Sequence, residues 1–345
     1  MQKTEVNSNR IEWIDCARGF AICMIVLAHV IQYFPCMEDV NLYICSFHVS
    51  IFFVLSGMLA YVRRDKPSSC NVVIRSRVES LLTPYIIFSI INFLIKFVVL
   101  SISGQYTIEL LEAELIELLI TGNGTVWFLM TLFLVEILYT FMSTYIRNKY
   151  IPFAVASILC STVFLLESYH NPILVVAKRV FVALFFYYVG YWAMRLKEKT
   201  LWMLEKGVVI SLLCLIPGYI LWNIYDVGIS YFPAEFSHLI PSVCMNVFTS
   251  LGWIFMVEAL TKHCKVTNHV LGFFGRNSLI IMLIHPILLM SYVYPIGFPI
   301  ESLSSLGEMM FSLLFFGILM LIQIPIIWII NKYFPWMIGK KKRYD

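Results

Sequence analysis

The stretch WIDCARGFAICMIVLAHVIQYF, residues 13–34, decides the fold of this chain. It is an almost unbroken apolar run, long enough to cross the roughly 30 Å hydrocarbon core of a bilayer as a helix. Arg18 and His29 interrupt it eleven residues apart, so on a helix both side chains share one face, about 16 Å apart along the axis. Ionisable groups inside a membrane are costly and tend to face a cavity or a partner. This face is therefore a candidate functional surface.

The composition of the whole chain extends the membrane interpretation. Hydrophobic residues make up 60% of the 345 residues, charged residues 13%, and the mean hydropathy is +0.82. Soluble domains carry roughly twice that charged fraction. Apolar runs predict ten spans, at residues 12–34, 43–62, 81–101, 125–146, 151–168, 173–194, 207–224, 239–260, 276–293 and 306–331. The sequence thus predicts an all-α polytopic membrane protein.

The charges of the connecting loops alternate. Basic connections hold Lys3 and Arg10; Arg63, Arg64, Lys66, Arg75 and Arg77; Arg147 and Lys149; Arg195, Lys197, Lys199 and Lys206; Lys262, Lys265 and Arg276; and Lys340 to Arg343. The intervening connections are acidic or neutral, with Glu38 and Asp39; Glu109, Glu112, Glu114 and Glu117; residues 168–171; Asp226 and Glu235; and Glu301. Basic loops lie on the cytoplasmic side, so both termini are predicted to be cytoplasmic, in agreement with an even number of spans.

These loops also explain the net charge of +4, which calls for no nucleic-acid partner. We expect one membrane-embedded domain over residues 1–345, with a core at 10–331 and a short basic tail at 332–345. The first apolar run holds two charges and lacks a small-residue cleavage site, so we expect no cleaved signal peptide. Helical spacing of the apolar residues between 103 and 125 predicts an amphipathic helix on the outer surface.

Nine cysteines show no zinc-site spacing, and the chain has no recognisable metal site or nucleotide-binding loop. Most of the cysteines fall in spans, where a small buried thiol is the ordinary interpretation. Cys36 and Cys45 flank the first outer loop, and the alternative for them is a disulfide in an oxidising compartment.

Two histidines fall at similar depth, because His29 precedes the outer end of the first span by about as much as His48 follows the outer start of the second. A neutral imidazole is the usual general base toward a hydroxyl, and the alternative is a hydrogen bond between helices. Asp15 and Arg18 have i, i+3 spacing, which allows three interpretations. The two side chains pair with each other, or they extend to the cytoplasmic interface. In the third interpretation, Arg18 binds an anionic ligand.

Other polar residues also stand out against the apolar background. The first inner loop contains five basic residues that face lipid headgroups or hold a phosphate-rich ligand through bidentate arginines. Lys178 and Arg179 lie near the outer end of their span, where they pair with Glu136 or bind an anionic or sugar acceptor. Lys96 and Glu258 are further charges within spans. Pro286 predicts a kink in its span, and His285, directly before it, is therefore expected to have a structural role.

Five segments carry a resemblance to a known family. They are Arg10–His29 (RIEWIDCARGFAICMIVLAH), Phe47–Met58 (FHVSIFFVLSGM), Leu81–Tyr85 (LLTPY), Trp127–Leu129 (WFL) and Gly275–Pro286 (GRNSLIIMLIHP). In this order they resemble the motifs of the acyltransferase 3 family of integral membrane acyltransferases, and the first is most similar to the fucose 4-O-acetylase-like branch. Many members have a basic residue directly before the LL-x-PY motif; this chain has Ser80 there, and Arg77 is the candidate substitute.

The resemblance implies transfer of an acyl group, most often acetyl, from cytosolic acetyl-CoA to a hydroxyl of an extracytoplasmic glycan or similar acceptor. It implies no tightly bound cofactor, and a place in the cytoplasmic (inner) membrane. The roles it suggests are His29 as general base or transient acyl carrier, His48 as its partner, and Arg18, Arg75 and Arg77 as ligands of the CoA phosphates. Candidate substrate-binding residues are Trp127, Lys178, Arg179 and Glu136. Trp127, Tyr187 and Tyr188 form either a stacking surface or part of an aromatic belt.

The rival interpretations are a transporter or flippase of a sugar or lipid-linked intermediate, and a membrane scaffold without activity.

Overall fold

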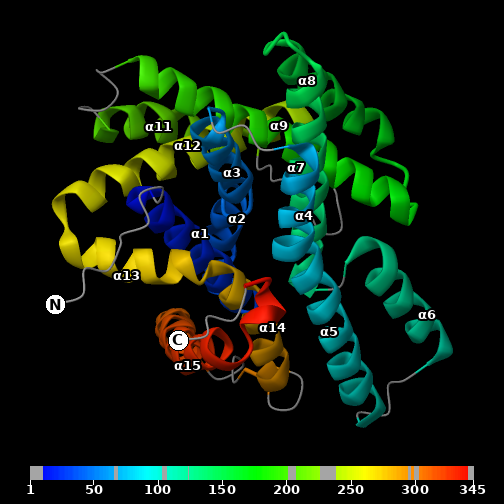
Figure 1. The fold of residues 1–345 in the computed structure, drawn as a ribbon. Coiled ribbons are helices and arrows are strands. Elements are labelled where there is room, and N and C mark those ends of the chain that lie inside the picture. Colours follow the sequence, from blue (N-terminus) through cyan, green and yellow to red (C-terminus); the bar gives the residue numbers. More distant parts are fainter. Residues whose placement is uncertain are drawn as a thin grey trace, which may run out of the picture.

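A computed structural model describes residues 11–65, 69–102, 107–122, 124–200, 207–225, 238–293, 297–298 and 303–340. The regular elements in these ranges are all helices, as predicted (Figure 1). They are α1 (Glu12–Ile31), α2 (Glu38–Cys45), α3 (Ser50–Arg63), α4 (Cys70–Arg77), α5 (Thr83–Ile102), α6 (Ile108–Ile116), α7 (Trp127–Tyr145), α8 (Ile151–Thr162), α9 (Pro172–Lys199), α11 (Gly207–Tyr225), α12 (Leu239–His263), α13 (Lys265–Arg276), α14 (Ser278–Val293) and α15 (Ser305–Tyr333). Short helical turns are η1 (Pro35–Met37), η2 (Val78–Leu82), η3 (Glu117–Thr121), η4 (Gly124–Val126), η5 (Val163–Leu166) and η6 (Pro335–Ile338). The loop charges Lys3, Arg10, Lys66, Lys206, Asp226, Glu235, Glu301 and Lys341 to Arg343 lie outside the described residues.

The predicted spans correspond to helices, although not all of them are long. Within the described ranges, eight helical segments are long and apolar enough to cross a membrane, and nine are if the bent pair α13–α14 is one span. The two helices of that pair meet at 73°. The predicted span 151–168 is the shorter apolar helix Ile151–Leu166, which reaches only about 24 Å. Within the described residues, eight or nine of the ten predicted spans are thus long enough to cross a membrane, and the helix at 151–166 is not.

Three helix crossings are built on glycine. Where α3 crosses α9, a Cβ atom on Gly57 would overlap the carbonyl oxygen of Tyr187, and one on Gly190 would overlap that of Val54. The same close approach occurs at Gly19 and Gly275 between α1 and α13. At Gly218 and Gly252, between α11 and α12, a Cβ would instead lie 2.7 Å from side-chain atoms of Thr249 and Leu215. Small residues let helix backbones pack closely where lipid supplies no hydrophobic drive. These crossings hold the helices in register around the site described below.

Helix ends that the loop charges assign to one side of the membrane contact one another. On the predicted cytoplasmic side, Gly339 packs directly against the backbone of Glu79, between η6 and η2. On the predicted outer side, the backbone N–H of Cys36 donates to Glu308 Oε2 at 3.3 Å, and the rings of Tyr33 and Phe298 lie 5.4 Å apart. The alternation of sides along the chain is thus consistent with the packing.

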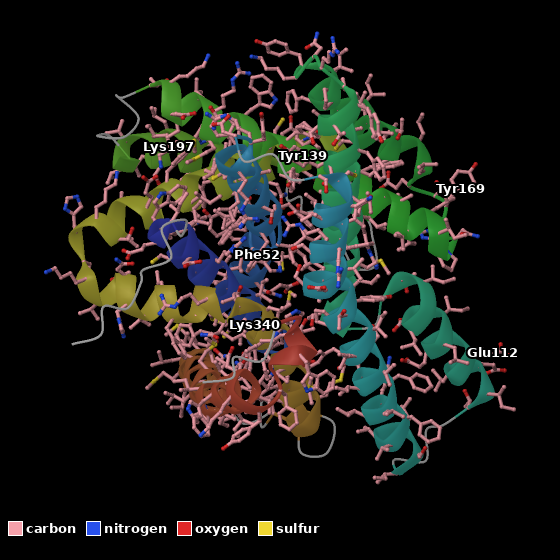
Figure 2. The ribbon with its side chains drawn as sticks, in the orientation of Figure 1. Phe52, Glu112, Tyr139, Tyr169, Lys197 and Lys340 are labelled. Atoms are coloured by element: carbon pink, nitrogen blue, oxygen red, sulfur yellow. The ribbon has the colours of Figure 1, made fainter. Side chains whose placement is uncertain are left out.

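The expected amphipathic helix is α6 continued by η3, and it lies against α5 as well as at the surface. Glu112 is exposed at the periphery of the molecule (Figure 2), whereas Glu114 is buried and forms an ion pair with Lys96 of α5. The Tyr85 hydroxyl near the start of α5 donates to the Leu118 carbonyl at 3.4 Å. The segment therefore returns alongside α5, because the charge of Lys96 needs a partner at that depth.

Candidate active site

Three histidines from separate helices meet inside the bundle, and we call them the histidine cluster. His29 of α1 and His285 of α14 have ring centroids 5.2 Å apart. His48, just before α3, interacts electrostatically with His29. His29 and His48 are half-buried, whereas His285 is fully buried. His29 and His48, which the sequence places at similar depth, interact electrostatically, and His285, for which the sequence indicates a structural role, lies against His29.

Backbone carbonyls fix the tautomer of two of these rings. His48 Nδ1 lies 3.0 Å from the carbonyl oxygen of Ile44, and His285 Nδ1 lies 2.8 Å from that of Ile281. A carbonyl oxygen only accepts, so in the neutral rings Nδ1 carries the proton and Nε2 carries the lone pair. Both histidines therefore present a basic nitrogen away from their own helix.

The WFL segment and the turn before it lie against two of the motif segments that carry the histidines. The Thr125 hydroxyl, in η4 directly before α7, donates to the Met282 carbonyl of α14 at 2.7 Å. The ring of Phe128 lies 5.6 Å from that of Phe52 and 5.0 Å from that of Phe53, on the helix that begins beside His48. Phe52 sits near the centre of the molecule (Figure 2). Motifs far apart in the sequence thus converge on the histidine cluster.

The predicted acceptor-binding cations take different partners. The Arg179 guanidinium carbon lies 5.1 Å from the centroid of the Trp127 ring, and its Nη1 donates to the Thr121 carbonyl at 2.6 Å. Lys178 Nζ donates to the carbonyl oxygen of Tyr169 at 3.1 Å, in the connection before α9 (Figure 2). Both cations are 1% exposed. Arg179 and Trp127 thus form one buried unit, and Lys178 caps a loop.

Of the two alternatives for the outer cations, the structure does not show the pairing with Glu136, whose carboxylate Oε2 lies 3.2 Å from Nε of Arg77. Both residues line a cavity of about 790 Å³, the inner cavity, which lies between the ends of α3, α4, α7 and α9. Its polar lining comprises Arg63, Arg64, Arg77, Glu136, Tyr139, Tyr187, Tyr191, Ser56, Ser76, Thr140, Ser143 and Thr144. The cavity is therefore cationic and aromatic, and it lies at helix ends predicted to be cytoplasmic.

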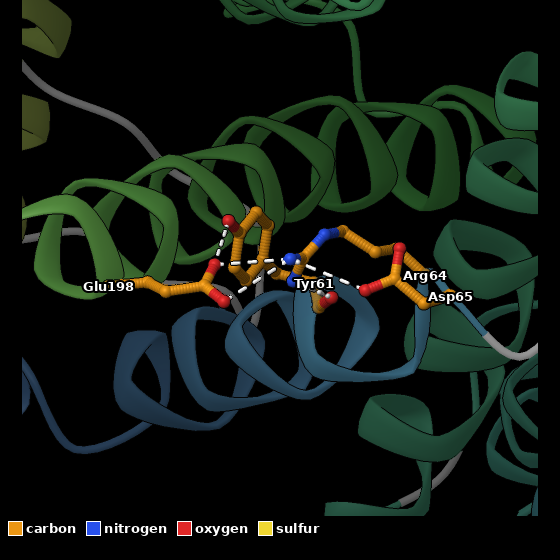
Figure 3. Close-up of polar contacts among 4 residues, drawn as sticks. All are labelled: Tyr61, Arg64, Asp65 and Glu198. Carbon is orange, nitrogen blue, oxygen red and sulfur yellow. Dashed lines mark hydrogen bonds and ion pairs between the residues drawn. The ribbon is translucent and has the colours of Figure 1, made fainter.

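The contacts of Arg64 fix its position at this cavity (Figure 3). Its guanidinium carbon lies 3.8 Å from the centroid of the Tyr61 ring. Its Nη2 lies 3.1 Å from Glu198 Oε2 and 3.3 Å from Asp65 Oδ2. The Tyr61 hydroxyl donates to Glu198 in turn. Four groups from two helices and a loop thus share one ionic network.

Of the arginines predicted to bind the donor, Arg77 lines the inner cavity. Arg75 points elsewhere, with a side chain that is 83% exposed and an ion pair to Glu79 at 3.3 Å. Arg18 is half-buried on α1 and is not part of the cavity lining. Arg63 and Arg64, two further residues of the basic inner loop, also line the cavity.

The remaining predicted groups have structural surroundings. Tyr187 lines the inner cavity, whereas Tyr188 is buried and donates to Met142 Sδ at 3.6 Å. Glu258 forms a buried ion pair with Lys197, whose Nζ lies 4.0 Å from the centroid of the Trp13 ring (Figure 2). Cys36 and Cys45 are both free thiols.

Comparison with known proteins adds the family. The sequence model of the acyltransferase 3 family, described as an acyltransferase domain, matches residues 11–335. No curated protein and no solved structure matches the chain. The matched range contains every helix described above. The chain therefore belongs to the acyltransferase 3 family and is a multi-pass membrane acyltransferase.

Proposed function

We propose that this acyltransferase moves an acetyl group from cytosolic acetyl-CoA to a hydroxyl of an extracytoplasmic glycan or a similar acceptor, from a site in the cytoplasmic (inner) membrane. One observation carries the proposal: α3 connects the inner cavity to the histidine cluster. Ser56 lines the cavity and His48 belongs to the cluster, and their separation of eight positions corresponds to about 12 Å along a helix. A long donor that enters from the cytoplasm is suited to reach from one to the other.

The inner cavity suits the nucleotide end of CoA. Its volume of about 790 Å³ falls within the range of small-molecule sites, roughly 300–1,000 Å³. Arg63, Arg64 and Arg77 would hold the phosphates, because guanidinium groups bind phosphate in a bidentate manner. Tyr139 and Tyr191 offer ring faces for the adenine base.

The histidine cluster suits the transfer step. His29 takes the proton of the acceptor hydroxyl as its oxygen attacks the thioester carbonyl, so a C–O bond forms and the C–S bond breaks. The departing CoA thiolate then recovers the proton from the His29 imidazolium. His48, held by Ile44, shares or orients this proton. In the alternative route His29 carries the acetyl group transiently.

Trp127, stacked with Arg179, is the proposed acceptor surface. An indole ring packs against the apolar face of a sugar, and a buried guanidinium stabilises its orientation. Lys178 lies next to Arg179 in the sequence and adds a second positive charge at the outer end of α9.

The test is acetyl transfer by purified protein in vesicles, with labelled acetyl-CoA outside and purified surface glycan from the host as acceptor. His29→Ala is expected to abolish labelling, whereas the control His269→Ala, at an exposed position of α13, is expected to retain it. Movement of solute without labelled product would establish the transporter alternative instead. Equal labelling by the His29→Ala protein would refute the role given to that histidine.

A further inference from the structure

His285 has the surroundings of an orienting residue. It is fully buried, and its Nδ1 is committed to the Ile281 carbonyl at 2.8 Å. Its Nε2 is also buried, and among the described residues it has no hydrogen-bond partner. Buried polar atoms in proteins are almost always paired, so an unpaired one calls for an explanation.

The His29 ring supplies that explanation. The two ring centroids are 5.2 Å apart and the planes are inclined by 39°. At this separation a ring N–H of His29 comes within hydrogen-bonding reach of the lone pair on His285 Nε2 after a small rotation about its side-chain bonds. The only titratable group that interacts electrostatically with His285 within the described part of the chain is His29.

We propose that His285 is the positioning residue of the site: its Nε2 accepts a hydrogen bond from one ring nitrogen of His29, so the other nitrogen of His29 presents its lone pair to the acceptor hydroxyl. This inference rests on the proposed function of His29. In catalytic triads a carboxylate performs this orienting role. Here a neutral imidazole performs it, which suits an apolar site because it introduces no net charge.

The fold holds His285 firmly enough for this role. The hydrogen bond from Nδ1 to the Ile281 carbonyl oxygen fixes the ring on its own helix, and Pro286 follows directly in the sequence. One turn earlier, the Met282 carbonyl accepts the Thr125 hydroxyl at 2.7 Å, which anchors α14 to η4, directly before α7. His48 is held by a similar hydrogen bond, from Nδ1 to the Ile44 carbonyl oxygen, but it is half-buried. It is therefore better placed to contact a substrate than to orient His29.

Two substitutions distinguish the role of Nδ1 of His285 from that of Nε2. In His285→Asn the amide N–H can replace Nδ1–H toward Ile281, but no acceptor remains at the Nε2 position. In His285→Gln the longer side chain brings an amide oxygen near that position and gives up the bond to Ile281. We expect His285→Asn to lower kcat about 10²-fold or more with little change in KM for acetyl-CoA, and His285→Gln to recover most of that loss. The reverse order, or equal activities in the two variants, would overturn the proposal.

A spectroscopic measurement gives an answer even if a variant folds poorly or the acceptor is wrong. In full-length protein labelled with 15N-histidine in detergent, the His29 resonances are assigned by comparison with His29→Ala. We expect a single neutral tautomer of His29 in the wild-type protein and a mixture of both in His285→Asn. A tautomer mixture already present in the wild-type protein would refute the orienting bond, whatever the enzymatic result. Absence of acetyl transfer together with a single tautomer would refute the proposed reaction and leave the bond established.

Discussion

Arg77 and Glu136 form an ion pair between α4 and α7 at the inner cavity, with Nε 3.2 Å from Oε2. The pair is largely shielded from solvent, since the two side chains are 23% and 12% exposed. Arg77 Nε is buried and makes no aligned hydrogen bond within the described residues, so the contact is ionic. The ion pair thus joins α4 to α7, and η4, directly before α7, contacts α14 near the histidine cluster.

The first prediction concerns this arginine. Arg77→Ala should weaken CoA binding about tenfold, because a hydrogen-bonded charge contact contributes about 1.5–3 kcal/mol and part of it is lost. Isothermal titration of purified protein with CoA measures the effect. Arg75→Ala is the matched control, as it removes a neighbouring arginine that points away from the cavity. Equal loss in both variants would show that general basicity, and not the cavity, binds the donor.

A second prediction tests the network around Arg64. Glu198→Gln removes a carboxylate that lies 3.1 Å from Nη2 of Arg64, so the site becomes more positive and CoA should bind about two- to threefold more tightly at low salt. The gain should fade as salt is raised, because the pair is partly exposed. Asp65→Asn should act in the same direction but more weakly, since Asp65 is 77% exposed. Weaker CoA binding by Glu198→Gln would mean that the carboxylate instead holds Arg64 in its binding position.

The glycine crossing between α3 and α9 gives a stability prediction. Gly57→Ala places a methyl group against the Tyr187 backbone, which must move, and overpacking of this kind costs about 1–3 kcal/mol. Thermal unfolding in detergent should therefore occur at a lower temperature. Gly317→Ala in α15 is the control, because a Cβ there meets nothing within 4 Å and should leave the transition unchanged or raise it.

The buried pair of Lys197 and Glu258 provides a double-mutant cycle. Lys197→Met leaves the buried Glu258 carboxylate with Lys262 alone, whose Nζ lies 3.4 Å from Oε1 and whose side chain is 45% exposed. Stability should therefore fall, by less than the about 3–5 kcal/mol expected for a fully unpaired buried charge. Lys197→Met combined with Glu258→Met should restore a large part of that loss, because no charge then remains buried. Additive losses, measured by unfolding of the purified proteins, would show that the two groups act independently.

The orientation of the chain is testable through Cys264. This thiol is exposed directly after α12, and a hydrogen bond from Thr267 lowers its pKa, which favours the reactive thiolate. A membrane-impermeant maleimide should label Cys264 only from the cytoplasmic face of oriented vesicles, and more quickly as pH rises. Cys36, which is exposed near the opposite helix ends, should be labelled only from the outer face. The reverse pattern would invert the predicted topology.

Hydropathy was sufficient to predict the helical class and the approximate positions of the long spans, because the bilayer imposes a minimum length on every apolar run. It failed in part at residues 151–168, where the helix is shorter than the run of apolar residues suggested. Loop charge placed the ends of helices on consistent sides, as the contact of Gly339 with Glu79 illustrates.

Contacts between distant helices were beyond reach of periodicity. His29 and His285 lie 256 residues apart, and no local spacing relates them. Spacing left open whether Glu136 pairs with Lys178 and Arg179, and the facing direction of α7 turns it to Arg77. Spacing along one helix likewise left the partner of Arg18 open, and the inner cavity is formed where four other helices end.

The bend at Asn277 has a consequence for the basic tail. Asn331 Nδ2 donates to Asn277 Oδ1 at 3.0 Å, and Lys340 Nζ donates to Asn331 Oδ1 at 2.8 Å. Asn277 stands directly before α14, the helix that carries His285. Lys340, whose charge the sequence explains by its position in a cytoplasmic tail, is thus linked through the side-chain amides of Asn331 and Asn277 to the bend before α14. The position of Lys340 is therefore tied, through these two amides, to the bend that precedes the helix carrying His285.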